Sequence, residues 1–432
     1  MATEKLISSK AQDSEMTTLR DSSPIQVIGG HGTYSYFNNS TYQKLAANVT
    51  KEKVDEAITR KLDVKSLLSS SPYPTNTIRL VDCGCAVGPN TFDTMQDLIE
   101  TIKEKYKSQC PDSAMPEFQV FFNDQTYNDF NTLFTSLPQE RQYFVAGVPG
   151  SFHQRLFPEC FVHVVHVSHA LHWLSTPPEE LVDRASGAWN KGRIHYAFAP
   201  EEVVNAYANQ FARDFDNFLN ARAKEIVPEG IIVISNPSIP DGMPISQIAN
   251  GLMYDCMGDI LNHMVKEGLI SEAHVDTFNL PVYSCPLGEF TALIERNGNF
   301  SIEAIGLTNP SPWLEGRINM PEFVKHIRAA FEGMFSKHFP LEICEEMYRR
   351  LVERLEEIND EMTACYRDGI QLYAVLQPTI RDTLVAILNS SDEYKKWAKF
   401  FASMRMTDLS CSTGWSSQLA LNADTKALKE AF

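Results

Sequence analysis

A short β-branched segment that ends in glycine and passes at once into a helix constrains the fold of this chain most strongly. Residues 77–84, TIRLVDCG, have the composition of a buried strand. Residues 89–107 begin with proline and carry apolar residues at helical spacing, which predicts a helix directly after the turn. Further strand signals lie at 118–124, 161–173 and 229–237. Strands that alternate with helices predict βαβ units, a mainly parallel sheet and an α/β fold.

Helical patterns separate these strands and then dominate the second half of the chain. The clearest of them, over 203–226, precedes the fourth strand signal. After Ser238 an apolar helical pattern without strand signals begins, and residues 320–366 are helical again, so we expect both stretches to form a cap over the sheet. Late strand signals lie at 300–307 and 371–377, and we expect 371–377 to close the sheet.

The charge balance disfavours two classes of partner. Lys and Arg number 38 against 55 Asp and Glu, and the net charge of −17 repels phosphate backbones and anionic lipid headgroups. We therefore expect no nucleic acid and no membrane as partner. No apolar run reaches the roughly 18 residues that span a bilayer, and the first 16 residues lack the apolar core of a secretion signal, so we expect a cytoplasmic protein.

Cysteine and histidine spacing predicts no metal centre. The nine cysteines are scattered without CxxC pairs, which is typical of reduced thiols. Four histidines lie three residues apart, at His163, His166, His169 and His172. Residues three apart point to opposite faces of a strand and drift by about 60° per step on a helix, so no more than two of these side chains can converge on one ion.

The turn after the first strand has the geometry of a nucleotide site. Gly84 and Gly88 lie where the strand passes into a helix, so backbone N–H groups and the positive end of the helix dipole face the crevice above the sheet. Asp82 repels phosphate but can bind an ammonium group, and Asp124, at the end of the next strand, can accept both hydrogen bonds of a ribose diol. G-x-G-x-x-G is missing, which disfavours a dinucleotide. S-adenosylmethionine fits these features, and a purely structural glycine turn is the alternative.

Five motifs identify a family resemblance that runs from Gly29 to Gln377. They are GG-x-G-x-x-SY-x-x-NS-x-x-Q, D-x-GC-x-x-GPNTF, FFND-x-x-x-NDFN, GVPGSF-x-x-RLFP and LHWLS, in this order. The set resembles the plant SABATH methyltransferases, which methylate small carboxylic acids or, in one branch, ring nitrogens of purines. The resemblance implies S-adenosylmethionine as methyl donor, a Rossmann-like sheet with an antiparallel last strand, a helical cap, a homodimer and no metal.

The resemblance also implies which residues form the site. Asp124 takes the ribose and Phe152 stacks near the adenine. Gln43 and Trp173 hold the acceptor carboxylate by an amide and an indole N–H; the alternatives are a surface helix residue for Gln43 and core packing for Trp173. The implied donor site consists of Tyr36, Ser40, Asp82, Gly84, Asn90, Asp124, Ser151 and Phe152.

Together these patterns divide the chain into four parts. The polar, non-periodic residues 1–27 are expected to be a flexible arm. The strands and their helices form a Rossmann-like methyltransferase core, the two apolar helical stretches form the cap, and the remainder is an atypical tail. The core is expected at 28–236, 284–312 and 367–378, the cap at 237–283 and 313–366, and the tail at 379–432.

Several positions depart from the salicylate-type members and bear on the substrate. The salicylate-type enzymes have tyrosine and methionine where this chain has His169 and His172, and tryptophan where it has Tyr254. Asp255 can pair with an amine if it faces inward. We therefore expect an oxygenated or basic acid, such as an iridoid acid or an alkaloid keto acid. The purine branch has asparagine at the place of Gln43, so a carboxylate acceptor is favoured over a ring nitrogen. The alternative functions are an N-methyltransferase and a non-catalytic ligand-binding protein.

Overall fold

The computed structural model describes residues 27–69, 76–308, 316–367 and 370–379. Apart from Val27 and Thr379, the expected arm and tail therefore lie outside the described residues, and so does the expected core-to-cap boundary near 312. The expected domain limits stay a prediction. Within the described ranges, no helix combines the length and apolarity needed to cross a membrane.

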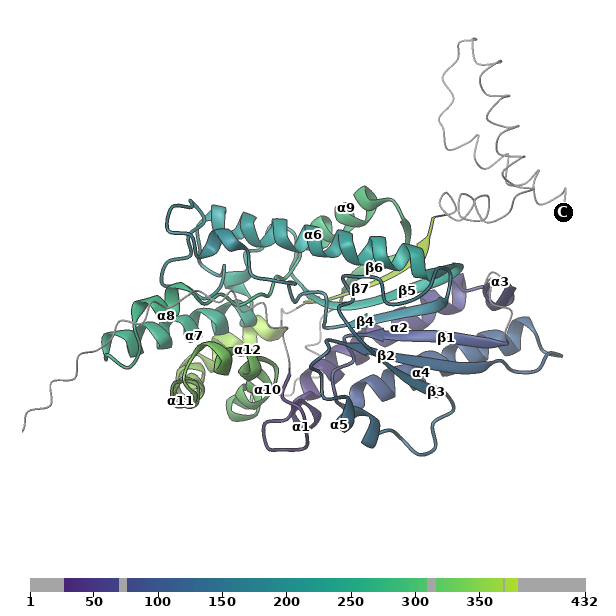
Figure 1. The fold of residues 1–432 in the computed structure, drawn as a ribbon, viewed down its shortest axis with the longest axis horizontal. Coiled ribbons are helices and arrows are strands. Elements are labelled where there is room, and N and C mark those ends of the chain that lie inside the picture. The colour runs from purple at the N-terminus through teal and green to yellow at the C-terminus, as the bar shows by residue number, and fades with distance from the viewer. Residues whose placement is uncertain (1–26, 70–75, 309–315, 368–369, 380–432) are drawn as a thin grey trace, which may run out of the picture. The chain divides into compact units, whose positions relative to one another are not determined.

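A seven-stranded sheet in the order β3-β2-β1-β4-β5-β7-β6 forms the centre of the described chain (Figure 1). The first five strands in this order are parallel, whereas β7 is antiparallel to both β5 and β6. The expected α/β architecture, a mainly parallel sheet with an antiparallel last strand, is thus confirmed. The strands are β1 Thr77–Cys83, β2 Glu117–Asp124, β3 Phe144–Pro149, β4 Val162–Ser168, β5 Ile226–Ser238, β6 Phe300–Thr308 and β7 Ile370–Pro378.

Three expectations about the strands were wrong. β3 was not expected, because this edge strand is only partly buried and Phe144 is 60% exposed, so it lacks a continuous apolar pattern. β7 does not close the sheet: its buried centre, Leu372–Leu376, lies between two neighbours, and the less buried β6 forms the edge. β4 ends at Ser168, so the last residues of the predicted strand 161–173 form a loop.

Helices cover both faces of the sheet because its strands alternate buried side chains between two apolar clusters. Leu80 of β1 joins the cluster with α2, α3 and α4, whereas its neighbour Val81 joins the cluster with α6 and α9. Figure 1 shows α6 and α9 on one side of the sheet and α2 and α4 on the other. These helices and the short α1 and α5 are α1 Tyr36–Asn39, α2 Thr41–Lys61, α3 Val64–Ser69, α4 Pro89–Gln109, α5 Phe130–Thr135, α6 Glu201–Glu225 and α9 Leu287–Asn297.

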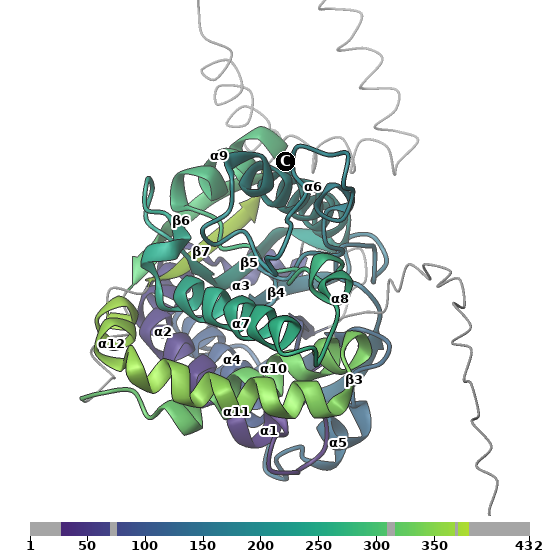
Figure 2. The same ribbon diagram turned by 90° about the vertical axis from the view of Figure 1, so that its left-hand side faces the viewer.

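The remaining helices form what we call the helical layer, which has an apolar cluster of its own. In Figure 2 this layer faces the viewer and lies across one end of the sheet, with α7 beside α11. Its position fits the expected cap, and the 3-10 turn Ile245–Gln247 leads into it. The layer consists of α7 Ala249–Lys266, α8 Glu272–Asp276, α10 Met320–His338, α11 Leu341–Glu357 and α12 Asn359–Arg367.

Two buried glycines of α7 offer a matched test of this packing. A Cβ on Gly251 would lie 1.9 Å from the carbonyl oxygen of Ile245, whereas a Cβ on Gly258 would meet Ile194 at 3.7 Å. We expect Gly251→Ala to lower the free energy of unfolding by about 1–3 kcal/mol through overpacking. Gly258→Ala should raise it by up to about 1 kcal/mol, because alanine is the better helix former. Urea unfolding followed by circular dichroism measures both, and equal losses would contradict this packing.

Candidate active site

A cavity of about 380 Å³ lies where the carboxyl ends of β2 and β4 meet the helical layer. Its lining comes from the sheet, from α2 and from α7 and α10, so side chains far apart in sequence converge on it. It brings together ten of the residues expected from the sequence, namely Tyr36, Gln43, Gly84, Asp124, Ser151, Phe152, His169, His172, Trp173 and Tyr254.

Three expected donor residues, Ser40, Asp82 and Asn90, make internal contacts and are not among the residues that line this cavity. Asp82 is 3% exposed and accepts hydrogen bonds from Thr91 Oγ1 and, at 2.7 Å, from His166 Nδ1. Asn90 Nδ2 donates to the Ser40 carbonyl oxygen at 2.8 Å, which ties the start of α4 to the start of α2. Their direct contact with a methyl donor stays a prediction.

Asp124 holds the glycine turn against the end of β2. One carboxylate oxygen accepts the N–H of Ala86 and the other that of Gln125, both at 2.7 Å. Gly84 has a φ of +84°, and a Cβ there would lie 2.5 Å from the Ala170 side chain, so the turn requires glycine for two reasons. Burial, the largest effect, raises the pKa of Asp124 to about 6. At neutral pH the carboxylate is therefore ionised and faces the cavity as an acceptor.

Gln43 of α2 and Trp173 of the loop after β4 line the same cavity. The ring of Trp173 lies 5.0 Å from that of Phe331 and 5.3 Å from that of His172, which fixes its plane between α10 and the sheet. Gln43 Oε1 is buried and has no hydrogen-bond partner in the part of the chain described. A buried amide oxygen without a partner costs roughly 1–3 kcal/mol, so the Gln43 side chain, which also lines the cavity, is a candidate for binding a ligand.

Three imidazoles in the cavity wall are neutral at pH 7. Burial lowers the pKa of His169 to about 3 and those of His172 and His326 to about 4. His326 Nδ1 lies 2.9 Å from the Asn39 carbonyl oxygen, which can only accept, so Nδ1 carries the proton and Nε2 is an acceptor.

The imidazoles of His172 and His169 differ in how many ring nitrogens have a hydrogen-bond partner. His172 Nδ1 faces Asn236 Oδ1 at 3.4 Å, which favours the same tautomer as in His326. His169 has both ring nitrogens engaged, with Ser168 Oγ at 2.9 Å and Gln371 Oε1 at 3.2 Å. Its φ of +52° is unusual for a residue with a side chain. The two hydrogen bonds of the His169 ring therefore hold a strained backbone position in the loop.

Among the polar residues that line the cavity, the sequence patterns did not single out His153, His326 or Gln371. His153 directly follows the predicted Ser151 and Phe152, a signal that could have been used. His326 and Gln371 depend on how α10 and β7 pack and had no local signal.

Asp255, expected to pair with an amine if it faced inward, lines a separate surface groove with Lys191, Arg193 and Asp259. It is not among the residues lining the larger cavity, whereas its neighbour Tyr254 lines both hollows. An amine partner inside the cavity is thus not supported. Among the described residues, no group of three or more His, Cys, Asp or Glu side chains is arranged to hold a metal ion.

Comparison with known proteins identifies the family. The profile of the SAM dependent carboxyl methyltransferases matches residues 22–379. A loganic acid O-methyltransferase of Catharanthus roseus is 42% identical over 81% of this chain and 93% of its own length. A farnesoic acid carboxyl-O-methyltransferase of Arabidopsis thaliana is 36% identical over 82% of this chain and 99% of its own length. A solved loganic acid methyltransferase with SAH has a TM-score of 0.78 at 40% identity, covering 82% of this chain and 98% of that one. The chain therefore belongs to the SABATH family of carboxyl methyltransferases, which use S-adenosylmethionine as methyl donor.

Proposed function

We propose that this chain methylates the carboxylate of a small hydroxylated acid, giving a methyl ester. The observation that carries the proposal is the shared cavity: the side chains of Gln43 and Trp173 line the same space as five residues of the predicted donor site, namely Tyr36, Gly84, Asp124, Ser151 and Phe152. Two N–H donors on one side and a nucleotide-type turn on the other are what a reaction between an acid and S-adenosylmethionine requires.

The donor end of the cavity suits a nucleoside. In our proposal Asp124 accepts the ribose hydroxyls and Phe152 packs near the adenine, with Ser151, Tyr36 and the Gly84 turn lining the rest. The left-handed φ of Gly84 supports this assignment, because a residue with a Cβ would not fit the turn. S-adenosylmethionine supplies an electrophilic methyl group on its sulfonium.

The acceptor end needs to orient an anion but not to deprotonate an acid. A carboxylic acid with a pKa near 4 is ionised at pH 7, so no general base is required. Gln43 and Trp173 can each donate one N–H to the carboxylate, which aligns one oxygen with the methyl group and excludes water without neutralising the charge. Transfer forms the O–CH₃ bond with an oxygen electron pair, and the S–CH₃ pair stays on sulfur.

The imidazoles indicate which acids fit. His172 and His326 have unprotonated Nε2 atoms in the cavity wall, which can accept hydrogen bonds from hydroxyl groups of a substrate. The Tyr254 hydroxyl adds another polar group at the helical layer. We therefore favour an iridoid acid, in line with the loganic acid relative, over salicylate. An alkaloid keto acid is the second substrate class in the proposal.

The proposal extends to the assembly and location of the protein. The family resemblance supports a homodimer, and the cytoplasmic location is the one expected from the sequence patterns. Size-exclusion chromatography with light scattering tests the dimer, and a fluorescent fusion in plant cells tests the location.

A panel of acids with methyl-labelled S-adenosylmethionine tests the function. We expect base-labile methyl esters, with kcat/KM at least about tenfold higher for hydroxylated iridoid acids than for their deoxygenated analogues, since each unpaired buried acceptor is costly. Label retained after alkaline hydrolysis would instead show an N-methyltransferase. Donor binding by calorimetry without product from any acid would show a non-catalytic ligand-binding protein.

Gln43→Asn should separate acceptor chemistry from donor binding. Shortening the side chain by one methylene moves the amide by more than an ångström, and a misplacement of that size costs about 100-fold in rate. We expect kcat to fall by roughly 10- to 100-fold while the affinity for S-adenosylhomocysteine changes less than about twofold. Gln96→Asn, on the outer surface of α4, is the matched control. An equal loss of donor affinity would refute this role for Gln43.

Asp124→Asn should weaken binding of the methyl donor and remove the loss of donor affinity at acid pH. The pKa of about 6 means that the wild-type carboxylate becomes protonated as the pH falls from 7 to 5. Protonation converts one acceptor oxygen into a donor, so the wild-type Kd for S-adenosylhomocysteine should rise over this range. In the variant the Kd should be at least about tenfold higher at pH 7 and should lack this rise.

Calorimetry from pH 5 to 8 measures both effects of the Asp124 substitution. Asp63→Asn, a carboxylate that caps the start of α3, is the control and should behave as wild type. Wild-type affinity in Asp124→Asn at pH 7 would exclude the ribose role.

A further inference from the structure

The segment after β3, which we call the 150–157 loop, carries the Ser151 and Phe152 side chains that line the cavity. It contains neither a helix nor a strand, so its backbone groups have no regular ladder to bond to. Phe152 is nevertheless only 8% exposed, and its ring packs edge-on against Phe218 of α6 at 6.0 Å. Something other than secondary structure must therefore hold this loop in place.

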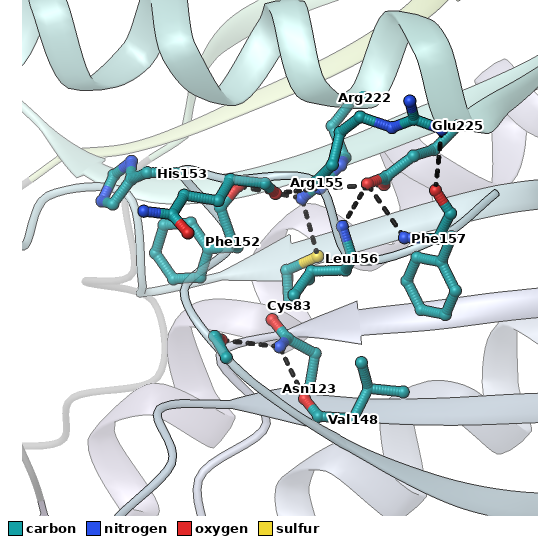
Figure 3. Close-up of polar contacts among 12 residues, drawn as sticks. Cys83, Asn123, Val148, Phe152, His153, Arg155, Leu156, Phe157, Arg222 and Glu225 are labelled. Carbon is teal, nitrogen blue, oxygen red and sulfur yellow. Dashed lines mark hydrogen bonds and ion pairs between the residues drawn. The ribbon is translucent and has the colours of Figure 1, made fainter. Parts of the chain in front are cut away.

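Two charged side chains from the last turn of α6 bind the loop (Figure 3). Arg222 Nη1 donates to the Phe152 carbonyl oxygen at 3.0 Å, and Nη2 donates to that of Gln154 at 2.9 Å. Glu225 Oε1 accepts the backbone N–H groups of Leu156 and Phe157. One helical turn thus pairs four backbone groups of the loop.

The two side chains also pair with each other. Arg222 Nη2 lies 2.8 Å from Glu225 Oε2, and both side chains are fully buried, at 0% and 1% exposure. The planar guanidinium can address two carbonyl oxygens and a carboxylate at once, which the point charge of a lysine cannot. Glu225 balances the charge and uses its other oxygen for the loop. The arrangement therefore leaves neither ion isolated in the interior.

The opposite side of the loop is held from the sheet. Asn123, at the end of β2 and fully buried, donates from Nδ2 to the carbonyl oxygens of Val148 and Gly150 at 2.8 and 2.9 Å. Figure 3 shows Asn123 below the loop and Arg222 with Glu225 above it. The backbone that carries Phe152 is thus bound from two directions.

Stability alone does not account for such a pair. Desolvating two ions costs about as much as their mutual attraction returns, and well-packed apolar residues of similar volume often serve a core equally well. What apolar residues cannot do is direct four backbone hydrogen bonds along an irregular loop. The arrangement specifies a loop conformation, at the point where that conformation sets the cavity wall.

We infer that Arg222 and Glu225 are positioning residues that hold the 150–157 loop so that Ser151 and Phe152 line the donor site. The inference rests on the proposed roles of Ser151 and Phe152. Beyond those roles, the inference states that an ion pair outside the cavity sets the affinity for the methyl donor and does not affect binding of the acid.

The test compares a double variant with a matched control. In Arg222→Met/Glu225→Leu the pair is replaced by apolar side chains, so no unpaired charge is left buried. The control is Arg79→Met. Arg79 is also buried and donates to the Phe161 backbone carbonyl, but it lies near the start of β1, away from the cavity. Circular dichroism first establishes a temperature at which each protein is folded, and calorimetry and kinetics follow at that temperature.

We expect the Kd for S-adenosylhomocysteine and the KM for S-adenosylmethionine to rise at least about tenfold in the double variant, whereas the KM for the acid changes less than about threefold. Hydrogen exchange should increase in the peptide that spans the 150–157 loop. Arg79→Met should lower the melting temperature without changing these constants. Donor constants within twofold of wild type in the folded double variant would overturn the inference, as would an equal rise in Arg79→Met.

A second variant covers the case in which the double variant does not fold. Arg222→Lys keeps the charge opposite Glu225 but can reach only one of the two carbonyl oxygens, so an intermediate rise in donor Kd supports the inference and an unchanged Kd refutes it. Wild-type protein separates the two proposals: if it fails to bind S-adenosylhomocysteine, the donor site itself is wrong. If it binds and the folded variants bind equally well, only the positioning role fails.

Discussion

Parallel strands must all end at the same edge of a sheet, and the rest of this site depends on that constraint. The glycine turn after β1, Asp124 at the end of β2, the 150–157 loop after β3 and Trp173 after β4 converge there, although almost ninety residues separate the first from the last. The edge alone is open, so the helical layer supplies the missing wall with Tyr254 and His326. One face of the cavity is thus set by backbone topology and the other by helix packing.

The described lining of the cavity offers no cationic side chain that would neutralise a bound anion. No lysine or arginine is among the described residues that line it, and burial keeps its imidazoles neutral. Neutral N–H donors can align a carboxylate without forming the tight ion pair that would lower its nucleophilicity. In such surroundings, the proposed reaction of a carboxylate with a sulfonium is favoured because it consumes both charges.

The sequence predicted local elements well and side-chain direction poorly. The apolar run at 77–84 and the proline-led helix after it have local causes, and both are found where expected. Asp82 shows the limit: its motif gave no indication of its contacts with Thr91 and His166 inside the fold, and its contact with a methyl donor stays a prediction. His326 shows another, because whether a histidine of α10 reaches the cavity depends on how that helix packs against α1. The order of β6 and β7 likewise depends on long-range pairing that no window of sequence contains.

The last turn of α6 illustrates why a charged residue in an amphipathic helix is easily misjudged. Helical spacing places Arg222 and Glu225 on the same buried face of α6 as Phe218, where an apolar pattern alone would not lead one to expect charged side chains. Both are buried because the irregular loop after β3 needs directional partners that its own backbone cannot supply. A loop that must present an aromatic ring at a fixed place cannot be held by apolar contacts alone, because such contacts have no direction. The buried ion pair is therefore best explained by the geometry of the site it supports, not by the stability of the helix that carries it.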